Sequence, residues 1–258
     1  MSAPVASAEE TAVRAIIEIA DDGLILGHRL SEWCGHAPIL EEELALANMG
    51  LDLLGQARAL YACAGELEGK GRSEDDFAFL RRERDYRNCL LVERENRDFA
   101  HTMLRQLYFA AFMQPMWQAI AESSSDENLR GIAAKADKEM TYHLRHAGEW
   151  VIRLGDGTEE SAARMADAVT ELHRYTGELF MASPARAQAI TNGLLPDPET
   201  IRATWDDTIA TVFAAAKLEL PEVRVPQKGG RDGIHGEDMG HLLAELQFMQ
   251  RAYPGQTW

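Results

Sequence analysis

The chain has 258 residues and a formal net charge of −16 at pH 7, from 26 basic and 42 acidic residues. This charge disfavours direct binding of nucleic acid, because contacts to phosphates require a basic surface. It is consistent with a soluble protein and leaves open that the acidic surface binds a basic partner. Hydrophobic residues make up 46% of the chain, so it can bury a sizeable core.

The sequence predicts a cytoplasmic protein that does not span a membrane. Its three cysteines, Cys34, Cys63 and Cys89, are widely spaced and form no CxxC motif, which predicts buried free thiols in a reducing compartment. The first ten residues, MSAPVASAEE, lack the charged start and apolar run of a signal peptide. No apolar stretch approaches the about eighteen residues that a membrane helix needs.

Four long segments in the first part of the chain have apolar residues three and four positions apart, which predicts helices. These segments are residues 9–34, 40–67, 89–122 and 127–154. The second segment has an apolar stripe that predicts its core-facing side: Leu44, Ala47, Leu51, Leu54, Ala57 and Tyr61. Pro115 predicts a kink in the third helix, and Asp126 is placed to cap the fourth.

Helical patterns continue in the second part of the chain. A helix over residues 158–181, capped by Thr158, is followed by helices over 201–218 and 237–253, with loops between them. Strand patterns are nearly absent. The sequence therefore predicts an all-α fold in one domain: a four-helix bundle over about residues 9–155 with helical additions over about 158–258.

The fourth helix contains a pattern related to a metal site. Di-iron bundles place one carboxylate on each of two helices and Glu-x-x-His on each of the other two. Here Glu139 is followed three residues later by Tyr142, and Asp52 on the second helix is followed by Gly55. Both positions that would carry a histidine have lost it, so the pattern indicates the remains of a metal site.

The spacing of charged residues suggests what replaces the metals. Asp22 lies 30 residues before Asp52, and Arg105 lies 34 residues before Glu139. If the helices pair, these four residues meet at the bundle centre, where Arg105 would neutralise part of the charge of the three carboxylates. We therefore predict a structural ion cluster and no catalytic, cofactor or metal site, since iron could not be held in that geometry. The alternative is that the four residues do not meet and form surface salt bridges.

Several runs of the sequence resemble the C-subunit family of bacterial ring-1,2-phenylacetyl-CoA epoxidases. They are residues 21–38 (DDGLILGHRLSEWCGHAP), 45–61 (ALANMGLDLLGQARALY), 138–150 (KEMTYHLRHAGEW) and the tail from residue 228 (KGGRDGIHGEDMGHLLAELQFMQRAYPGQTW). The resemblance extends from about residue 14 to residue 258, with the segments in the same order. It implies a ferritin-like fold and a place in a multicomponent monooxygenase of aerobic phenylacetate degradation.

The resemblance also implies partners. In that family an A-type subunit holds the di-iron centre and binds phenylacetyl-CoA, and the C-type subunit pairs with it, lacks metal ligands and is structural. Small B and D components and a reductase that draws on NADPH through flavin and an iron–sulfur cluster complete the system. The di-iron cofactor is therefore expected in the partner and not in this chain. The stoichiometry, the face that binds the A-type subunit and homodimerisation of the lone chain stay open.

Two further groups of residues have alternative interpretations. His143 and His146, with Glu139, have spacing compatible with a mononuclear metal site, but such histidines more often form hydrogen bonds within a core or interface. The run Lys228, Gly229, Gly230 and Arg231 is basic and glycine-rich before a helix, which suits a partner-binding loop or a cradle for the phosphates of CoA.

Two other function classes remain as alternatives to a structural subunit. The first is a di-iron oxygenase in its own right, with an atypical metal site made of Glu139, Asp52 and His143. The second is a stand-alone helical interaction module whose acidic surface recruits a basic partner. Iron bound by the lone chain would favour the first, and stable function without an A-type subunit would favour the second.

Overall fold

The computed structural model describes residues 8–223 and 225–256. Within these ranges every regular element is a helix, and no strand is present. The predicted all-α fold class is therefore confirmed.

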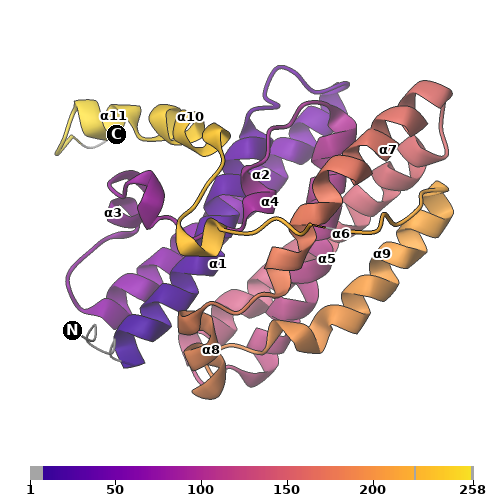
Figure 1. Cartoon of the computed structure of the whole chain (residues 1–258). Coiled ribbons are helices and arrows are strands. Elements are labelled where there is room, and N and C mark those ends of the chain that lie inside the picture. Colours follow the sequence, from indigo (N-terminus) through magenta and orange to yellow (C-terminus); the bar gives the residue numbers. More distant parts are fainter. Residues whose placement is uncertain (1–7, 224, 257–258) are drawn as a thin grey trace.

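Four long helices form two antiparallel pairs. Helix α1 (Ala8–Ser31) packs along α2 (Leu40–Glu68), and α5 (Phe99–Ser123) packs along α6 (Glu127–Gly155). The two pairs also meet where α2 contacts α6. Figure 1 shows the four helices as the body of the molecule. Burial of their apolar faces against one another is the main driving force for this arrangement, as the sequence predicts for a four-helix bundle.

Side-chain caps start several helices where the sequence places them. The Asp126 carboxylate accepts a hydrogen bond from the backbone N–H of Leu129 at 2.7 Å, and the Thr158 hydroxyl accepts one from Ser161 at 3.2 Å. Such caps satisfy backbone donors that have no partner in the first helical turn. Both predicted caps are confirmed.

The segment predicted as the third helix is divided in two. A single helical turn, α4 (Leu90–Glu93), precedes α5, and residues 94–98 between them are not helical. Two features cause the break: Arg97 has a left-handed backbone with φ of 48°, and Asp98 caps α5 through the N–H of His101. Pro115 lies inside α5, which continues on both sides of it.

The remaining elements are shorter. The segment between α2 and α4 forms α3 (Glu74–Phe79) and a 3₁₀ turn. The helix predicted over 158–181 is an α-helix only in its first part, α7 (Glu159–Leu172), and continues as a 3₁₀ helix, His173–Phe180. The others are α8 (Pro184–Thr191), α9 (Arg202–Ala216), α10 (Glu237–Leu246) and α11 (Phe248–Ala252).

The connection between α9 and α10 crosses the bundle. It runs from the end of α9 over the front of the molecule in Figure 1 and reaches α1 before α10 begins. A short 3₁₀ turn, Gly230–Asp232, lies where this connection meets α1. The C-terminal helices α10 and α11 therefore lie against the segment that contains α3 and the following 3₁₀ turn, where Gln247 donates to the carbonyls of Ala78 and Arg81. They are far from α9 (Figure 1).

Two expectations about burial need correction. Cys63 and Cys89 are buried, as predicted, but Cys34 is exposed because it follows the end of α1 in a turn. The predicted stripe of α2 does not face the core as a unit: Tyr61 is 1% exposed, whereas Leu44 and Leu51 are 58% and 65% exposed. The stripe mixes two sides of a helix that is apolar on both.

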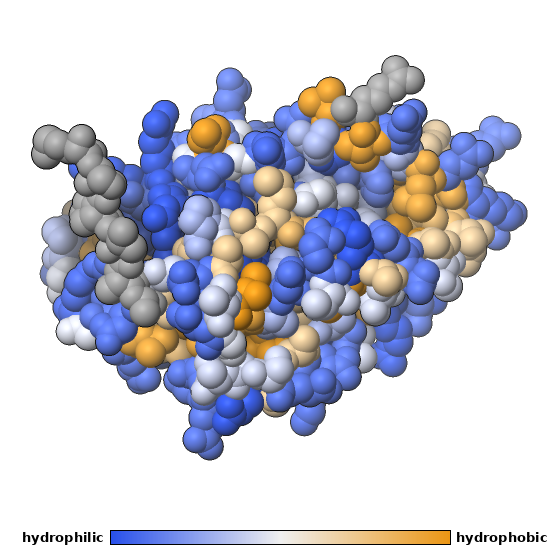
Figure 2. All heavy atoms as spheres, turned by 60° about the horizontal axis from the view of Figure 1, so that its bottom comes forward, coloured by the Kyte–Doolittle hydropathy of each residue, from blue (hydrophilic) through white to orange (hydrophobic). Residues whose placement is uncertain are grey.

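The surface of one face of the molecule is largely polar. Figure 2 shows one face of the molecule, on which hydrophobic side chains form separate patches among mostly hydrophilic ones. Within the described ranges, no helix combines the length and the apolar character needed to cross a membrane.

Candidate functional site

Three acidic side chains of α1 lie in the interior. Glu18, Asp21 and Asp22 are each at most 1% exposed. Burying a carboxylate is costly unless hydrogen-bond donors or a cation replace the water that it loses. The partners of these three residues therefore define the polar centre of this part of the molecule.

Asp22 is paired with an arginine from the far end of the chain. Arg231 donates from Nη1 to Oδ1 at 3.0 Å and from Nη2 to Oδ2 at 2.7 Å, and the N–H of Cys89 donates to Oδ1 at 2.7 Å. Arg231 Nη1 also donates to the backbone carbonyls of Glu18 and Arg87. A two-point guanidinium–carboxylate contact is the strongest geometry for such a pair. It joins the connection before α10 to α1 and to the segment before α4.

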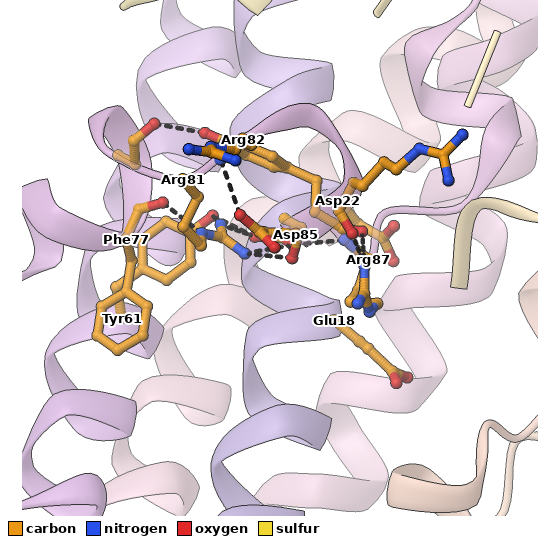
Figure 3. Close-up of polar contacts among 12 residues, drawn as sticks. Glu18, Asp22, Tyr61, Phe77, Arg81, Arg82, Asp85 and Arg87 are labelled. Carbon is orange, nitrogen blue, oxygen red and sulfur yellow. Dashed lines mark hydrogen bonds and ion pairs between the residues drawn. The ribbon is translucent and has the colours of Figure 1, made fainter. Parts of the chain in front are cut away.

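Asp21 has a second arginine, which comes from the segment after α3. Arg81 donates to both carboxylate oxygens of Asp21, the Tyr61 hydroxyl donates to Oδ1, and the N–H of Arg87 donates to Oδ2 at 2.7 Å. Figure 3 shows Arg81, Tyr61 and Arg87 in the same polar region of the interior as Asp22. Burial and the negative charge of Asp21 raise the pKa of Tyr61 well above its usual value. The phenol therefore stays protonated and donates a hydrogen bond to Asp21.

Two further buried carboxylates hold the segment that contains Arg231. Glu178 accepts hydrogen bonds from the backbone N–H groups of Leu90, Gly229 and Arg231. Glu93 accepts bonds from the N–H of Gly236 at 2.6 Å and pairs with the ring of His235 at 2.7 Å. These contacts fix the whole segment 229–236 against α1, α4 and the 3₁₀ helix after α7.

The predicted partner or CoA loop therefore divides into two parts. Gly229, Gly230 and Arg231 are buried, and a Cβ at Gly230 would lie 2.0 Å from the carbonyl oxygen of Asn88. The guanidinium of Arg231 is already bound to Asp22 and is not available to a phosphate. Lys228 is exposed, so it alone of the four presents a charge to solvent. The carboxylates of Asp22 and Glu178 hold Arg231 inward, so contact of this loop with CoA or a partner stays a prediction, for which Lys228 is the residue that faces solvent.

Asp52 lies at the contact between α2 and α6, in a chain of hydrogen bonds. Its Oδ2 is 3.2 Å from His143 Nε2, and His143 Nδ1 is 3.0 Å from the amide nitrogen of Gln106 on α5. The amide nitrogen can only donate, so Nδ1 accepts and Nε2 carries the proton that is shared with Asp52. The chain Asp52–His143–Gln106 thus links α2, α6 and α5.

Glu139 lies at the same contact with different partners. Its carboxylate accepts a hydrogen bond from Gln56 Nε2 at 2.9 Å and is 3.2 Å from Lys135 Nζ. Gly55 has open space around its Cα, and Tyr142 is 38% exposed with its ring beside His146. The two positions where a di-iron bundle carries histidines thus hold no group that contacts Glu139 or Asp52.

Arg105 is not the cation of these carboxylates. It donates to the carbonyl of Arg94 and to Asn96 Oδ1, in the break between α4 and α5. Burial lowers its pKa to about 9, with a smaller effect from Arg29. The predicted pairing of Arg105 with Asp22, Asp52 and Glu139 is wrong, because the break before α5 needs a donor that the helical pattern did not reveal.

The histidine-based metal site is not assembled in this structure. Glu139, His143 and His146 each have a different partner, and His146 Nε2 is 2.9 Å from Glu42 on α2. Throughout residues 8–223 and 225–256, no group of three or more His, Cys, Asp and Glu is placed to hold a metal ion. The hydrogen-bonding role that the sequence left open for His143 and His146 is the one found.

Several residues of this site were missed from the sequence, namely Asp21, Arg81, Glu178 and Glu93. The adjacent acidic pair Asp21–Asp22 within an apolar helix was an available signal, since charges at such positions need partners. Which partners they take was not readable, because Arg81 and Arg231 lie 60 and 209 positions away.

Comparison with known proteins identifies the family. The family model described as phenylacetic acid catabolic protein matches residues 2–258. The C subunit of the 1,2-phenylacetyl-CoA epoxidase of Escherichia coli (strain K12) is 45% identical over 242 residues, which cover 94% of this chain and 97% of that protein. The resemblance inferred from the sequence runs is confirmed, and the chain belongs to the phenylacetic acid catabolic protein family.

Proposed function

We propose that the chain is the structural C-type subunit of a phenylacetyl-CoA epoxidase in aerobic phenylacetate degradation. It pairs with the di-iron catalytic A-type subunit, and B, D and reductase components complete the cytoplasmic complex. One observation carries this proposal: the 45% identity to a C-type relative over nearly the full length of both chains.

The side chains at the predicted metal positions support a structural role. Each of the three carboxylates already has a hydrogen-bond partner: Asp52 pairs with His143, Glu139 with Gln56, and Asp22 with Arg231. Two iron ions would have to displace these donors and would find neither of the two expected histidines. This set of residues does not suit a di-iron centre, which agrees with a subunit that leaves the redox chemistry to its partner.

The buried ion pairs give the subunit a defined shape. Asp22–Arg231 and Asp21–Arg81 join α1 to segments that are remote in sequence. Each buried charge needs its partner, because removing one alone leaves the other uncompensated, so the pairs specify which segments pack against α1. A fixed surface suits a subunit whose role is to hold and support a catalytic partner.

The test is the iron content of the lone chain and of the complex. The chain is purified alone and after co-expression with the A-type subunit of the same organism, and iron is measured by elemental analysis. We expect no iron on the lone chain, stable co-purification, and iron in proportion to the A-type subunit. Two irons per lone chain would establish the di-iron oxygenase alternative, and failure to co-purify would favour a stand-alone interaction module.

A further inference from the structure

The outer side of α2 carries exposed leucines along its first half. Leu40, Leu44 and Leu51 point away from the core and are 69%, 58% and 65% exposed. Gly55 and Ala62 continue the same side and are also exposed. We call these five residues the α2 stripe. Their spacing of four and seven places them on one face, and from Leu40 to Ala62 the stripe spans roughly 33 Å.

The opposite side of α2 is fully occupied by the core. Leu46, Met49, Leu53 and Leu60 are at most 1% exposed and pack in the hydrophobic core. The helix is therefore apolar on two sides, of which this chain covers one. A helix with apolar side chains on two sides normally buries both, and this chain covers only the side opposite the α2 stripe.

A groove continues the stripe toward α6. It has a volume of about 690 Å³, and Gly55 belongs both to its lining and to the stripe. Its other small lining residues are Ala59, Gly131 and Ala136, and Lys135 and Glu139 stand at its edge. Small residues between two helices leave room for the side chains of a third helix to insert. The stripe and the groove thus adjoin at Gly55 and form one continuous surface.

Acidic residues near the two ends of the stripe indicate whether a second copy of this chain or a different polypeptide binds there. Glu41 and Glu66 are exposed, and neither forms an ion pair within the residues that the structure describes. Arg58 lies on the same side of α2, between Gly55 and Ala62, and is paired with Glu74 at 3.0 Å. In a parallel pairing of two copies Glu41 would meet Glu41, and in an antiparallel pairing it would approach Glu66. Like charges facing each other oppose association, so a second copy does not suit this surface.

We propose that the α2 stripe and its groove bind an amphipathic helix of a different polypeptide, with apolar residues at its centre and Lys or Arg toward its ends. This inference rests on the proposed function, in which the A-type subunit supplies that helix. Apolar side chains seated in the groove would provide most of the affinity, and the basic flanks would orient the helix against Glu41 and Glu66.

The experiment compares two pairs of variants in co-expression with the A-type subunit. Leu44→Glu with Leu51→Glu alters the stripe, and Leu80→Glu with Leu220→Glu is the matched control, because these leucines are 56% and 50% exposed elsewhere. We expect the stripe variant to retain roughly a tenth or less of the A-type subunit that co-purifies with the wild type. The control variant should retain it, and thermal unfolding of each lone chain should be unchanged, because the replaced side chains are exposed.

The outcomes separate this inference from the proposed function. If the wild type co-purifies and the stripe variant does so equally well, the docking surface is wrong while the proposed function stands. If the wild type fails to co-purify, the proposed function fails and the inference with it. A homodimer of the lone chain, detected by light scattering and dissociated by the stripe substitutions, would assign the surface to a second copy and overturn the inference.

Discussion

The Arg231 guanidinium contacts both carboxylate oxygens of Asp22 across 209 positions of the sequence. This pair closes the connection before α10 onto the first helix of the bundle. Arg231 is thus the cation that neutralises Asp22, a role that the spacing of charges in the sequence had assigned to Arg105. Both partners are almost fully buried, and with Glu178 and Glu93 the pair holds the segment before α10 against the bundle.

Replacing Arg231 by glutamine should strongly destabilise the protein. The change leaves the Asp22 carboxylate buried without a cation, which typically costs about 3–5 kcal/mol. Arg105→Gln is the matched comparison, since Arg105 is also buried but donates only to a carbonyl and an amide oxygen. Losing those bonds costs about 1–3 kcal/mol. Urea unfolding of the two variants measures the difference, and equal losses would contradict the assigned role of Arg231.

Asp21 and Arg81 should be energetically coupled. Either Asp21→Asn or Arg81→Met alone leaves the other charge buried, whereas the double variant removes both. The double variant should therefore lose less stability than the sum of the single variants, with a coupling of about 0.5–3 kcal/mol. A double-mutant cycle from denaturant unfolding measures this coupling. Strict additivity would show that the two side chains do not interact in solution.

His235 should make stability fall at alkaline pH. Burial acts against its charge, but the hydrogen bond to Glu93 and the charge of Glu93 raise the pKa of His235 above 6.5. The stabilisation is then complete below pH 6.5 and is lost as the pH rises through the raised pKa. His235→Gln should lose this pH dependence, whereas substitution of the exposed His241 should keep it. The measurement is the free energy of unfolding from about pH 6 to about pH 9. If this free energy depended on pH equally in both variants, His235 would not be the group responsible.

His28 should have the opposite effect at acid pH. Burial lowers the pKa of His28 to about 4 from 6.5. The folded state therefore binds this proton less readily than the unfolded state, and stability is lost as the pH falls from 6.5 toward 4. His28→Gln should lose less stability over this interval than the wild type. Substitution of the exposed His36 is the control, and thermal unfolding across the same interval provides the comparison.

Two glycines should respond oppositely to alanine. Gly230→Ala would place a Cβ 2.0 Å from the carbonyl oxygen of Asn88, and backbone on both sides leaves little room to move. We expect a loss of about 1–3 kcal/mol or more, as for overpacking of a core. Gly55→Ala meets nothing within 4 Å inside a helix and should stabilise the lone chain by about 1 kcal/mol. Differential scanning calorimetry distinguishes the two, and destabilisation by Gly55→Ala would contradict the open groove at that position.

Local features of the fold were readable from the sequence because they depend on neighbouring residues. Apolar spacing located the four long helices. Asp126 and Thr158 marked helix starts, because each caps a backbone N–H only three positions further along the chain. The break at residues 94–98 was missed, because Arg97 and Asp98 interrupt a pattern that is otherwise helical. The side of α2 that faces the core was also misjudged, since a helix that is apolar on two sides has no single period to read.

The sequence by itself determined the helical fold, the family, and the loss of histidines at Gly55 and Tyr142, because these depend on residue type and local order. Tertiary structure decided which charges meet. Asp22 pairs with Arg231 and not with Arg105, and Asp21 pairs with Arg81. These pairs form because the packing of α1 against remote segments brings the groups within hydrogen-bond distance. Coulombic attraction depends on separation in space, and separation along the chain gives no measure of it.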